Sequence, residues 1–208
     1  MSCVIEPKEN GPYLVKNLQS LTNSRGADIL PDKEVIALCR CGKSSSKPFC
    51  DGSHKKTGFV SGPDRPEVGK WRDYAGKKIT IHDNRRLCAH AGKCTDGLAD
   101  VWRMGKKPWI DPDNADVEAI IATIEQCPSG ALSYSIEGKR NYVAVAADNV
   151  VVSANGPYHV TGQLALNDPS LNTSDVPNQY ALCRCGASKN KPFCDGSHWD
   201  IEFKDDNN

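Results

Sequence analysis

The sequence predicts an α+β protein in which two small, loop-rich β modules, related as a pseudo-twofold repeat, flank a unit of βαβ type. Three cysteines and one histidine recur with the same spacing, in a first Cys/His loop (39–54) and a second Cys/His loop (183–198). A strand-like segment precedes each loop, and apolar residues at helical spacing lie between the repeats. The chain therefore divides into a first repeat (1–62), a central unit (63–147) and a second repeat (148–208).

In the first repeat we expect residues 1–10 to form a loose lead-in, with Cys3 as an ordinary thiol near a frayed terminus. A Gly-Pro turn then introduces a strand over residues 11–18, and a second strand over 35–38 leads into the first cysteine of the loop. The second repeat has counterparts of both strands, at residues 156–164 and 179–182.

Inside each Cys/His loop, the residues before the histidine predict a short helix. Aspartate and serine are favoured at helix N-caps, and they occur as Asp51 and Ser53 in the first copy. The histidine, which is His54 in the first copy and His198 in the second, is then expected at the start of the helix. The arginine between the first two cysteines of each copy is expected either to offset thiolate charge or to be solvated.

The central unit follows a Gly- and Pro-containing linker at residues 61–66. Its expected elements are a strand, a helix and a second strand, at residues 77–82, 115–126 and 132–136. Residues 143–152 are expected to be extended and to join the second repeat. The polar residues 205–208 are expected to form a disordered tail.

The composition narrows the class of protein. Lys and Arg together number 26, as do Asp and Glu, and this formal charge of zero argues against a nucleic-acid-binding surface. The start of the chain has no apolar signal segment and no apolar run is long enough to span a bilayer, so we expect no membrane association. The 10 cysteines are then expected in a reducing cytoplasm, where metal ligation is favoured over disulfides.

Each Cys/His loop carries a set of metal-binding side chains with the spacing C-x-C-x8-C-x3-H. Thiols and imidazoles are ligands for borderline and soft metals. A structural zinc site usually has a C-x2–4-C pair, which the C-x-C pair of this loop fits less well. Disulfides conflict with the expected compartment. A [2Fe–2S] cluster, with two protein ligands on each iron, is therefore favoured over zinc.

Both loops read C-x-C-x2-S-x3-P-x-C-D-G-S-H, and through this pattern they resemble the CDGSH iron–sulfur family of mitoNEET-like proteins. The resemblance implies two [2Fe–2S] clusters. One would be held by Cys39, Cys41, Cys50 and His54, and the other by Cys183, Cys185, Cys194 and His198. Members of this family often act as homodimers with one cluster per subunit. The duplication therefore implies that the two modules pair within one chain.

A third group of cysteines lies in the central unit and consists of Cys88, Cys94 and Cys127. Through C-x2-A-G-x-C and a later C-P, residues 68–140 resemble the divergent single-cluster ferredoxins, which implies a ferredoxin-like domain with one further cluster. Ala91 stands where an ordinary [4Fe–4S] loop has its middle thiol. Three thiolates favour a [3Fe–4S] cluster. The alternative is a [4Fe–4S] cluster in which His90 supplies the fourth ligand.

The function expected from these features is electron transfer by an iron–sulfur protein, with a reductase and a downstream oxidoreductase as partners. No G-x-G-x-x-G fingerprint follows a strand and no nucleophile–base set is visible, so we do not expect an enzyme. The alternative function is cluster storage, cluster transfer or redox sensing. A third interpretation is a zinc-stapled interaction module.

Overall fold

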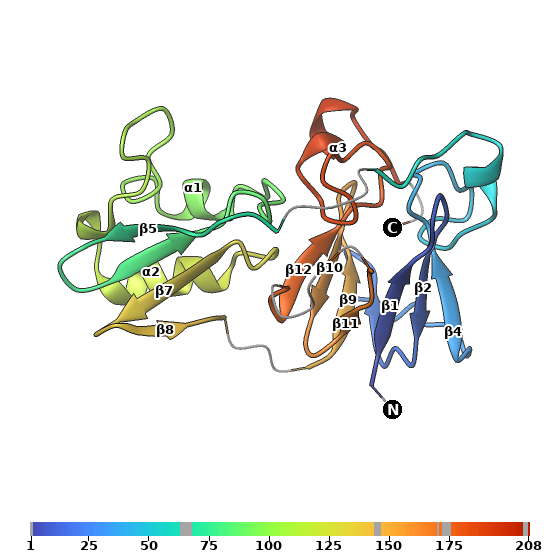
Figure 1. Ribbon diagram of the computed structural model, residues 1–208, viewed down its shortest axis with the longest axis horizontal. Helices are drawn as coiled ribbons and strands as arrows, with labels where there is room; N and C mark the ends of the chain where they lie inside the picture. The colour runs from blue at the N-terminus through green and yellow to red at the C-terminus, as the bar shows by residue number, and fades with distance from the viewer. Residues whose placement is uncertain (1, 63–67, 144–146, 170, 172–175, 206–207) are drawn as a thin grey trace.

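The structure is a computed structural model that describes residues 2–62, 68–143, 147–169, 171, 176–205 and 208. The described strands form three sheets of four strands each. Two of these sheets lie side by side and contain the strands of the repeats, while the third belongs to the central unit (Figure 1). The architecture is therefore α+β, with two similar modules on either side of the central unit in the sequence.

The first sheet has the strand order β11-β1-β2-β4. Strands β2 (Tyr13–Lys16) and β4 (Val35–Leu38) occupy the segments predicted from the sequence and pair antiparallel. Strand β1 (Val4–Pro7) pairs with the other edge of β2. The prediction of a loose lead-in was therefore wrong. Ile5 is 1% exposed and Cys3 is 2% exposed, because both side chains pack into the main hydrophobic core.

The second sheet repeats this design with the order β12-β10-β9-β3. Its own strands are β9 (Asn149–Val152), β10 (Tyr158–Thr161) and β12 (Gln179–Leu182). They pair antiparallel, as β1, β2 and β4 do in the first sheet. The two strands predicted for the second repeat are confirmed at β10 and β12. The expected extended segment before them is a strand at β9, whereas residues 144–146 lie outside the described residues.

The two repeats exchange their fourth strands. Strand β3 (Leu21–Thr22), from the first repeat, pairs parallel with β9 of the second sheet. Strand β11 (Ala165–Leu166), from the second repeat, pairs parallel with β1 of the first sheet. Each sheet therefore contains three strands of its own repeat and one strand of the other repeat.

The two sheets also share a core, to which β2 and β10 contribute alternate side chains. Tyr13 and Tyr158, at matching positions of these strands, pack edge to face with ring centroids 6.1 Å apart. The Tyr13 hydroxyl lies 2.8 Å from the carbonyl oxygen of Cys183, and the Tyr158 hydroxyl lies 2.9 Å from that of Cys39. Each repeat is therefore hydrogen-bonded to the Cys/His loop of the other.

The central unit has an antiparallel sheet of order β5-β6-β7-β8. Its strands are β5 (Arg72–Ala75), β6 (Thr80–Asp83), β7 (Leu132–Ile136) and β8 (Lys139–Asn141). Between β6 and β7 lie α1 (Lys93–Gly97), the 3-10 helix η2 (Pro112–Asn114) and α2 (Val117–Glu125). The expected strand–helix–strand order is present. However, β6 and β7 are antiparallel neighbours and not the parallel pair of a βαβ crossover. The ferredoxin-like character of this unit stays a prediction.

Helix α2 forms where the apolar spacing predicts it, and its buried face packs into the core. Ile120 and Ile124 are both 0% exposed, and they lie one turn apart on the same face of the helix. The helix ends at Glu125, and the backbone N–H of Cys127 donates a 2.9 Å hydrogen bond to the carbonyl of Ile124. The packing of α2 therefore also fixes the third cysteine of the central unit.

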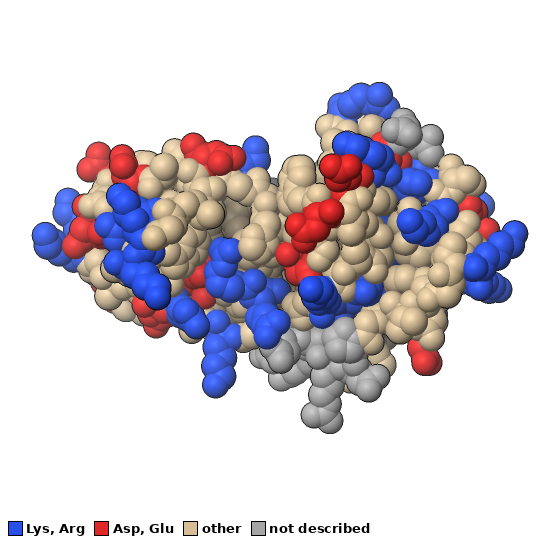
Figure 2. Space-filling model, turned by 90° about the horizontal axis from the view of Figure 1, so that it is seen from above, with Lys and Arg blue, Asp and Glu red and all other residues tan. Residues whose placement is uncertain are grey.

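In space, the second repeat lies between the central unit and the first repeat, although it comes last in the sequence (Figure 1). Both Cys/His loops lie at the same end of their sheets. Figure 2 shows the molecule from that end, where acidic and basic side chains both occur. Among the described residues, no helix is both long and apolar enough to cross a bilayer.

Candidate metal centres

The four predicted ligands of each Cys/His loop lie together as two pairs. In the first loop the sulfur atoms of Cys39 and Cys41 are 3.8 Å apart, and the sulfur of Cys50 is 3.4 Å from Nδ1 of His54. The corresponding distances in the second loop are also 3.8 Å and 3.4 Å, for the pairs Cys183–Cys185 and Cys194–His198. Each distance is the one expected for two donor atoms on one tetrahedral metal atom, given metal–sulfur bonds of about 2.3 Å and metal–nitrogen bonds of about 2.1 Å.

Among the described residues, no group of three or more Cys, His, Asp or Glu side chains is arranged around a position for one metal ion. A structural zinc ion needs four donors around one point. Two separate pairs instead fit a group with two metal atoms, each held by one pair. The donor set of each loop therefore fits the binuclear group that the sequence pattern implies.

Backbone and side-chain hydrogen bonds close the first Cys/His loop around its ligands. The N–H of Cys39 donates to the carbonyl of Pro48, and the N–H of Cys50 donates to that of Ala37. Inside the loop, the Ser44 hydroxyl donates a 2.6 Å hydrogen bond to the carbonyl of Phe49. The second loop has the same three hydrogen bonds. The serine and proline of the repeated pattern are therefore explained by loop closure.

The turn before each histidine is capped by glycine and not by the predicted aspartate or serine. Gly52 and Gly196 occupy the N-cap positions with φ of 86° and 88°, a left-handed conformation that glycine adopts without steric cost. The carboxylate of Asp51 instead accepts hydrogen bonds from the backbone N–H groups of Ser45 and Ser53. These bonds, with those of the two serine hydroxyls, hold the pKa of Asp51 well below its usual range. The predicted short helices do form, as η1 (Ser53–Lys55) and α3 (Ser197–Asp200).

The arginine inside each Cys/His loop is buried, so its interpretation as a solvated side chain is wrong. Arg40 is 4% exposed and donates hydrogen bonds to Lys8 and Ser61. Arg184 is 1% exposed and forms an ion pair with Asp205. Because the two side chains lie at the same position of the repeat, their different partners are the main polar difference between the loops.

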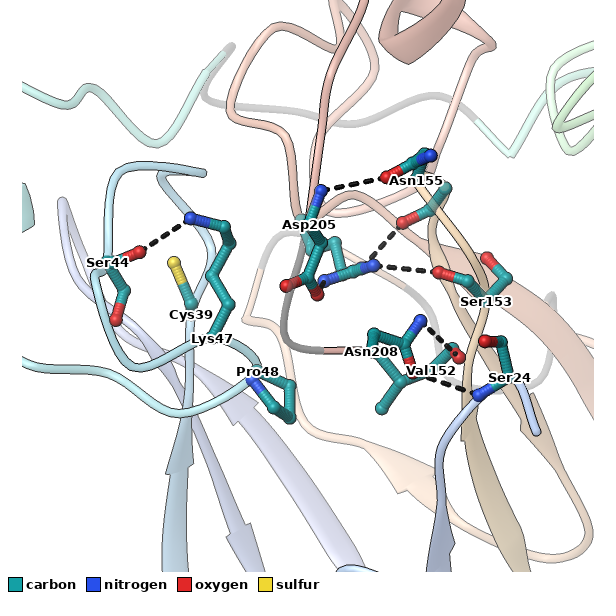
Figure 3. A network of polar contacts seen from close by, with 12 residues as sticks. Ser24, Cys39, Ser44, Lys47, Pro48, Val152, Ser153, Asn155, Asp205 and Asn208 are labelled. Carbon is teal, nitrogen blue, oxygen red and sulfur yellow. Dashed lines mark hydrogen bonds and ion pairs between the residues drawn. The ribbon is translucent and has the colours of Figure 1, made fainter. Parts of the chain in front are cut away.

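The partner of Arg184 comes from the segment predicted to be a disordered tail. Asp205 is 4% exposed, and its N–H donates to the side chain of Asn155 (Figure 3). Asn208 accepts from the N–H of Ser24 and donates to the carbonyl of Val152. The prediction of disorder was therefore wrong for Asp205 and Asn208, whereas residues 206–207 lie outside the described residues.

Burial disfavours the charged form of several predicted ligands. Loss of hydration raises the pKa of Cys41 to about 11 and that of Cys194 to about 12. In the central unit it raises the pKa of Cys94 to about 11. A thiolate in such surroundings needs a nearby positive charge, which a bound metal supplies. Cys183 differs, because its hydrogen bond with Cys185 lowers its pKa to about 6. Burial therefore disfavours the thiolates of Cys41, Cys94 and Cys194, and a bound metal would offset that cost.

The predicted ligands of the central unit line one cavity. Cys88, Cys94 and Cys127 form its walls together with His90 and Ala91. Residue 91 has no ligating side chain, and His90 is exposed with φ of 55°. The structure therefore brings the three thiols to one place, as the sequence analysis requires, and leaves the fourth ligand position without a cysteine.

A carboxylate that the sequence analysis missed lines the same cavity. Asp83 is the last residue of β6 and is 0% exposed. Burial raises its pKa to about 6. The available signal was its position: it follows Ile79 and Ile81 at every second residue, so an acidic side chain occupies the apolar face of a strand.

The three candidate centres contact one another through their loops. A side chain at Gly42 would overlap the backbone of Cys185, and one at Gly186 would overlap the backbone of Cys41. The two Cys/His loops are therefore in direct backbone contact. On the other side of the second loop, a Cβ at Gly196 would lie 3.0 Å from Cβ of His90, so the central unit packs against the turn that carries His198.

Comparisons with known proteins match the parts of the chain that carry these residues to two families. A family model described as "Iron-binding zinc finger CDGSH type" matches residues 10–55 and 155–199. A second family model, described as "Divergent 4Fe-4S mono-cluster", matches residues 74–137. The chain is 42% identical over 66 residues to the uncharacterized protein YjdI of Escherichia coli K12, which covers 32% of this chain and 87% of YjdI. YjdI of Escherichia coli O157:H7 matches equally well. No solved structure matches the chain.

Two thiol- and imidazole-bearing loops and a three-thiol cavity define the class of an iron–sulfur protein. Within that class, the chain belongs to the CDGSH iron-binding family, with a divergent 4Fe–4S mono-cluster unit between two CDGSH modules.

Proposed function

We propose that the protein is an electron carrier with two [2Fe–2S] clusters, one in each Cys/His loop, and one further cluster in the central unit. The ligands of the first loop would be Cys39, Cys41, Cys50 and His54, and those of the second loop Cys183, Cys185, Cys194 and His198. The central cluster, of [3Fe–4S] or [4Fe–4S] type, would be held by Cys88, Cys94 and Cys127. When bound, these clusters would supply one-electron redox chemistry, and the single nitrogen ligand would raise the potential above that of an all-cysteine site.

The observation that carries this proposal is the close packing of the loops that hold the ligand sets. Sites that exchange electrons must lie close together, and here the second Cys/His loop packs against the first loop on one side and against His90 of the central unit on the other. Cys194 also clusters with Ala89 of the central unit, which lies next to Cys88. Storage or delivery of separate clusters would not require three ligand sets to pack against one another.

The role of the chain in this function is to hold its ligands in fixed pairs and to exclude water from them. Cys183, Cys185 and Cys194 are each at most 6% exposed. The cross-linking hydrogen bonds of Tyr13 and Tyr158 would keep the two CDGSH modules together as an intramolecular pair. We propose a reductase and a downstream oxidoreductase as the partners of such a carrier, with no role for nucleic acid or membrane, and no catalytic reaction of its own. Its free thiols suit a reducing, cytoplasmic environment.

The test begins with protein purified anaerobically. Iron and acid-labile sulfide analysis with Mössbauer spectroscopy should give two binuclear clusters and one larger cluster per chain. The reduced protein should then be mixed with an oxidised ferredoxin and, separately, with an apo-ferredoxin. Electron exchange without loss of iron supports the proposal. Zinc in both Cys/His loops would overturn it.

Cluster storage, cluster transfer or redox sensing is the second candidate function, and the exposure of the first loop favours it. Cys50 and His54 are only partly buried, so this pair of ligands is open to competing ligands or protons. Movement of iron and sulfide from the first loop to the apo-ferredoxin, faster than electron exchange, would establish this function in place of the first.

A further inference from the structure

The cavity of the central unit holds one buried group that neither the fold nor the proposed thiolate ligands use. Asp83 is 0% exposed, and neither of its carboxylate oxygens has a hydrogen-bond partner. Leaving a buried carboxylate without hydrogen bonds is unfavourable, because the group has lost its hydration without gaining a partner. Such a group therefore calls for a partner that is not part of the polypeptide.

Burial outweighs the favourable effects of Arg85, Arg72 and the Trp109 side chain on the pKa of Asp83, so its surroundings compensate the carboxylate only in part. Its nearest cation is Arg85, whose Nη1 lies 4.0 Å from Oδ1, at the outer limit of an ion pair. The side chain of Arg85 is 43% exposed, and its guanidinium lies over the ring of Trp109 at 4.9 Å. Arg85 therefore divides its contacts between Asp83 and Trp109 and is too far from the carboxylate for a close ion pair.

The strand geometry places Asp83 on the buried face of β6, which borders the cavity of the three thiols. In β6 the buried Ile81 and Asp83 share one face of the sheet, whereas His82 faces the other side and contacts Asp73 and Ser135. Asp83 lies opposite Leu132 in the ladder with β7, and both residues line the cavity.

The other candidate, His90, is placed differently. Its side chain is exposed, and its Cβ and ring lie against Gly196 of the second Cys/His loop, within 3.1 Å of a Cβ built there. Its backbone N–H donates a 3.4 Å hydrogen bond to the sulfur of Cys88. These contacts fit a residue that joins the central unit to the second loop.

We propose that Asp83 is the fourth protein ligand of the central cluster, that the cluster is therefore of [4Fe–4S] type, and that His90 is a packing residue. The proposal rests on the proposed function in that it requires a cluster at Cys88, Cys94 and Cys127. Carboxylate oxygen is a harder ligand than thiolate and suits a different range of metals. The iron bound by Asp83 is thus the one lost most easily, which would yield a [3Fe–4S] cluster with the three cysteines alone.

The test is the iron content and EPR spectrum of the full chain, purified anaerobically, for the wild type and four variants. Oxidised [2Fe–2S] and [4Fe–4S] clusters are EPR-silent, so the oxidised protein reports a three-iron cluster without interference from the CDGSH modules. Asp83→Ala should lose one iron per chain and show the signal of a [3Fe–4S] cluster. His90→Ala should keep the wild-type spectrum. Asp73→Asn, which removes an exposed carboxylate from the neighbouring strand, is the matched control and should also leave it unchanged.

Asp83→Cys covers the case in which Asp83→Ala does not fold. A thiolate at this position should retain all the iron of the wild type, resist loss of iron on mild oxidation and lower the potential of the central cluster. An unchanged potential and unchanged resistance to loss of iron in Asp83→Cys would overturn the proposal, as would a three-iron signal in His90→Ala alone.

Measurements on the wild-type protein show whether a failure concerns the assignment of Asp83 alone or also the proposed electron carrier. A central cluster that stays of the three-iron type after treatment with ferrous iron and a reductant overturns the assignment of Asp83 and leaves the electron carrier intact. A central site without any iron overturns both.

Discussion

The two Cys/His loops have the same ligand distances and the same turn, yet they differ in their access to solvent. Cys50 and His54 of the first loop are partly buried, whereas Cys194 and His198 of the second loop are 2% and 5% exposed. The second loop lies against the central unit, where His90 packs on Gly196. The first loop has no such neighbour among the described residues.

The comparison of the two loops distinguishes what sets the positions of the ligands from what sets their exposure to solvent. Local hydrogen bonds, which are the same in both loops, set the positions of the ligands. The tertiary neighbours, which differ, set the exposure of those ligands. A duplicated motif can therefore provide two sites of the same geometry and of different reactivity.

The largest loss of stability is expected from substitutions that disrupt the backbone contact between the two Cys/His loops. Gly42→Ala places a methyl group into the backbone of Cys185 and forces alanine into a φ of 74°. Overpacking of about 3 kcal/mol and a left-handed backbone cost of about 1 kcal/mol together predict a loss of roughly 4 kcal/mol. Gly186→Ala should behave alike, because it meets the backbone of Cys41. Denaturant unfolding followed by tryptophan fluorescence measures both.

The matched control is Gly52→Ala, where φ is 86° and nothing lies within 4 Å of the new methyl group. Its cost should be only about 1 kcal/mol. Equal losses at Gly42 and Gly52 would show that the contact between the loops does not contribute to stability.

The next largest loss of stability is expected at the buried arginine of each loop, where the two loops have different polar partners. Arg184→Met removes the guanidinium from the buried carboxylate of Asp205 and should cost about 3 kcal/mol, because breaking one side of a buried ion pair is strongly unfavourable. Arg40→Met, at the same position of the first loop, removes hydrogen bonds to uncharged oxygens and should cost about 1–2 kcal/mol. The midpoints of urea unfolding compare the two variants. A larger loss for Arg40→Met would contradict the assignment of the ion pair.

A smaller effect tests the crossed hydrogen bonds. Tyr13→Phe should destabilise the second loop and Tyr158→Phe the first loop, each by about 1–2 kcal/mol, since each hydroxyl bonds to the carbonyl groups of the opposite repeat. The measurement is the rate at which each loop loses iron to a chelator. Mössbauer spectra of selectively labelled protein distinguish the two loops and show which site is weakened. Weakening of the same-repeat loop would be inconsistent with these contacts.

The smallest expected effect concerns the solvent exposure of the ligands in the first loop. After removal of iron under native conditions, Cys50 should react with iodoacetamide several-fold faster than Cys194, which is buried and whose pKa is raised to about 12 by loss of hydration. Peptide mass spectrometry with a short labelling pulse measures the two rates. Equal rates would mean that the central unit does not shield the second loop.

Much of the candidate site could be predicted from the sequence, because its ligands and turns depend on local spacing. The pattern around Cys39 to His54 indicates the ligand set, the strands β4 and β12 and the short helices without any reference to the rest of the chain. The structure brings these ligands together, while their binding of a metal stays a prediction.

The remaining features depend on contacts between distant parts of the chain. Strands β3 and β11 have only two residues each, which is too short for a period-2 pattern, and their partners lie in the other repeat. The burial of Cys3 and the ion pair of Asp205 follow from the same kind of contact. Asp83 could have been noticed as an acidic residue on an apolar strand face, but its cavity forms only when Cys88 and Cys127 meet.

The exchange of β3 and β11 affects the order in which the parts of the protein can fold during synthesis. Until residue 165 has been synthesised, the chain lacks β11, the strand that pairs with the edge of β1. The edge of β1 therefore stays unpaired while the central unit is synthesised. The sheet of the central unit contains only strands of that unit, so it does not need the second repeat in order to form. We therefore expect the central unit to fold first on the ribosome and both repeats to close together once the second repeat has been synthesised.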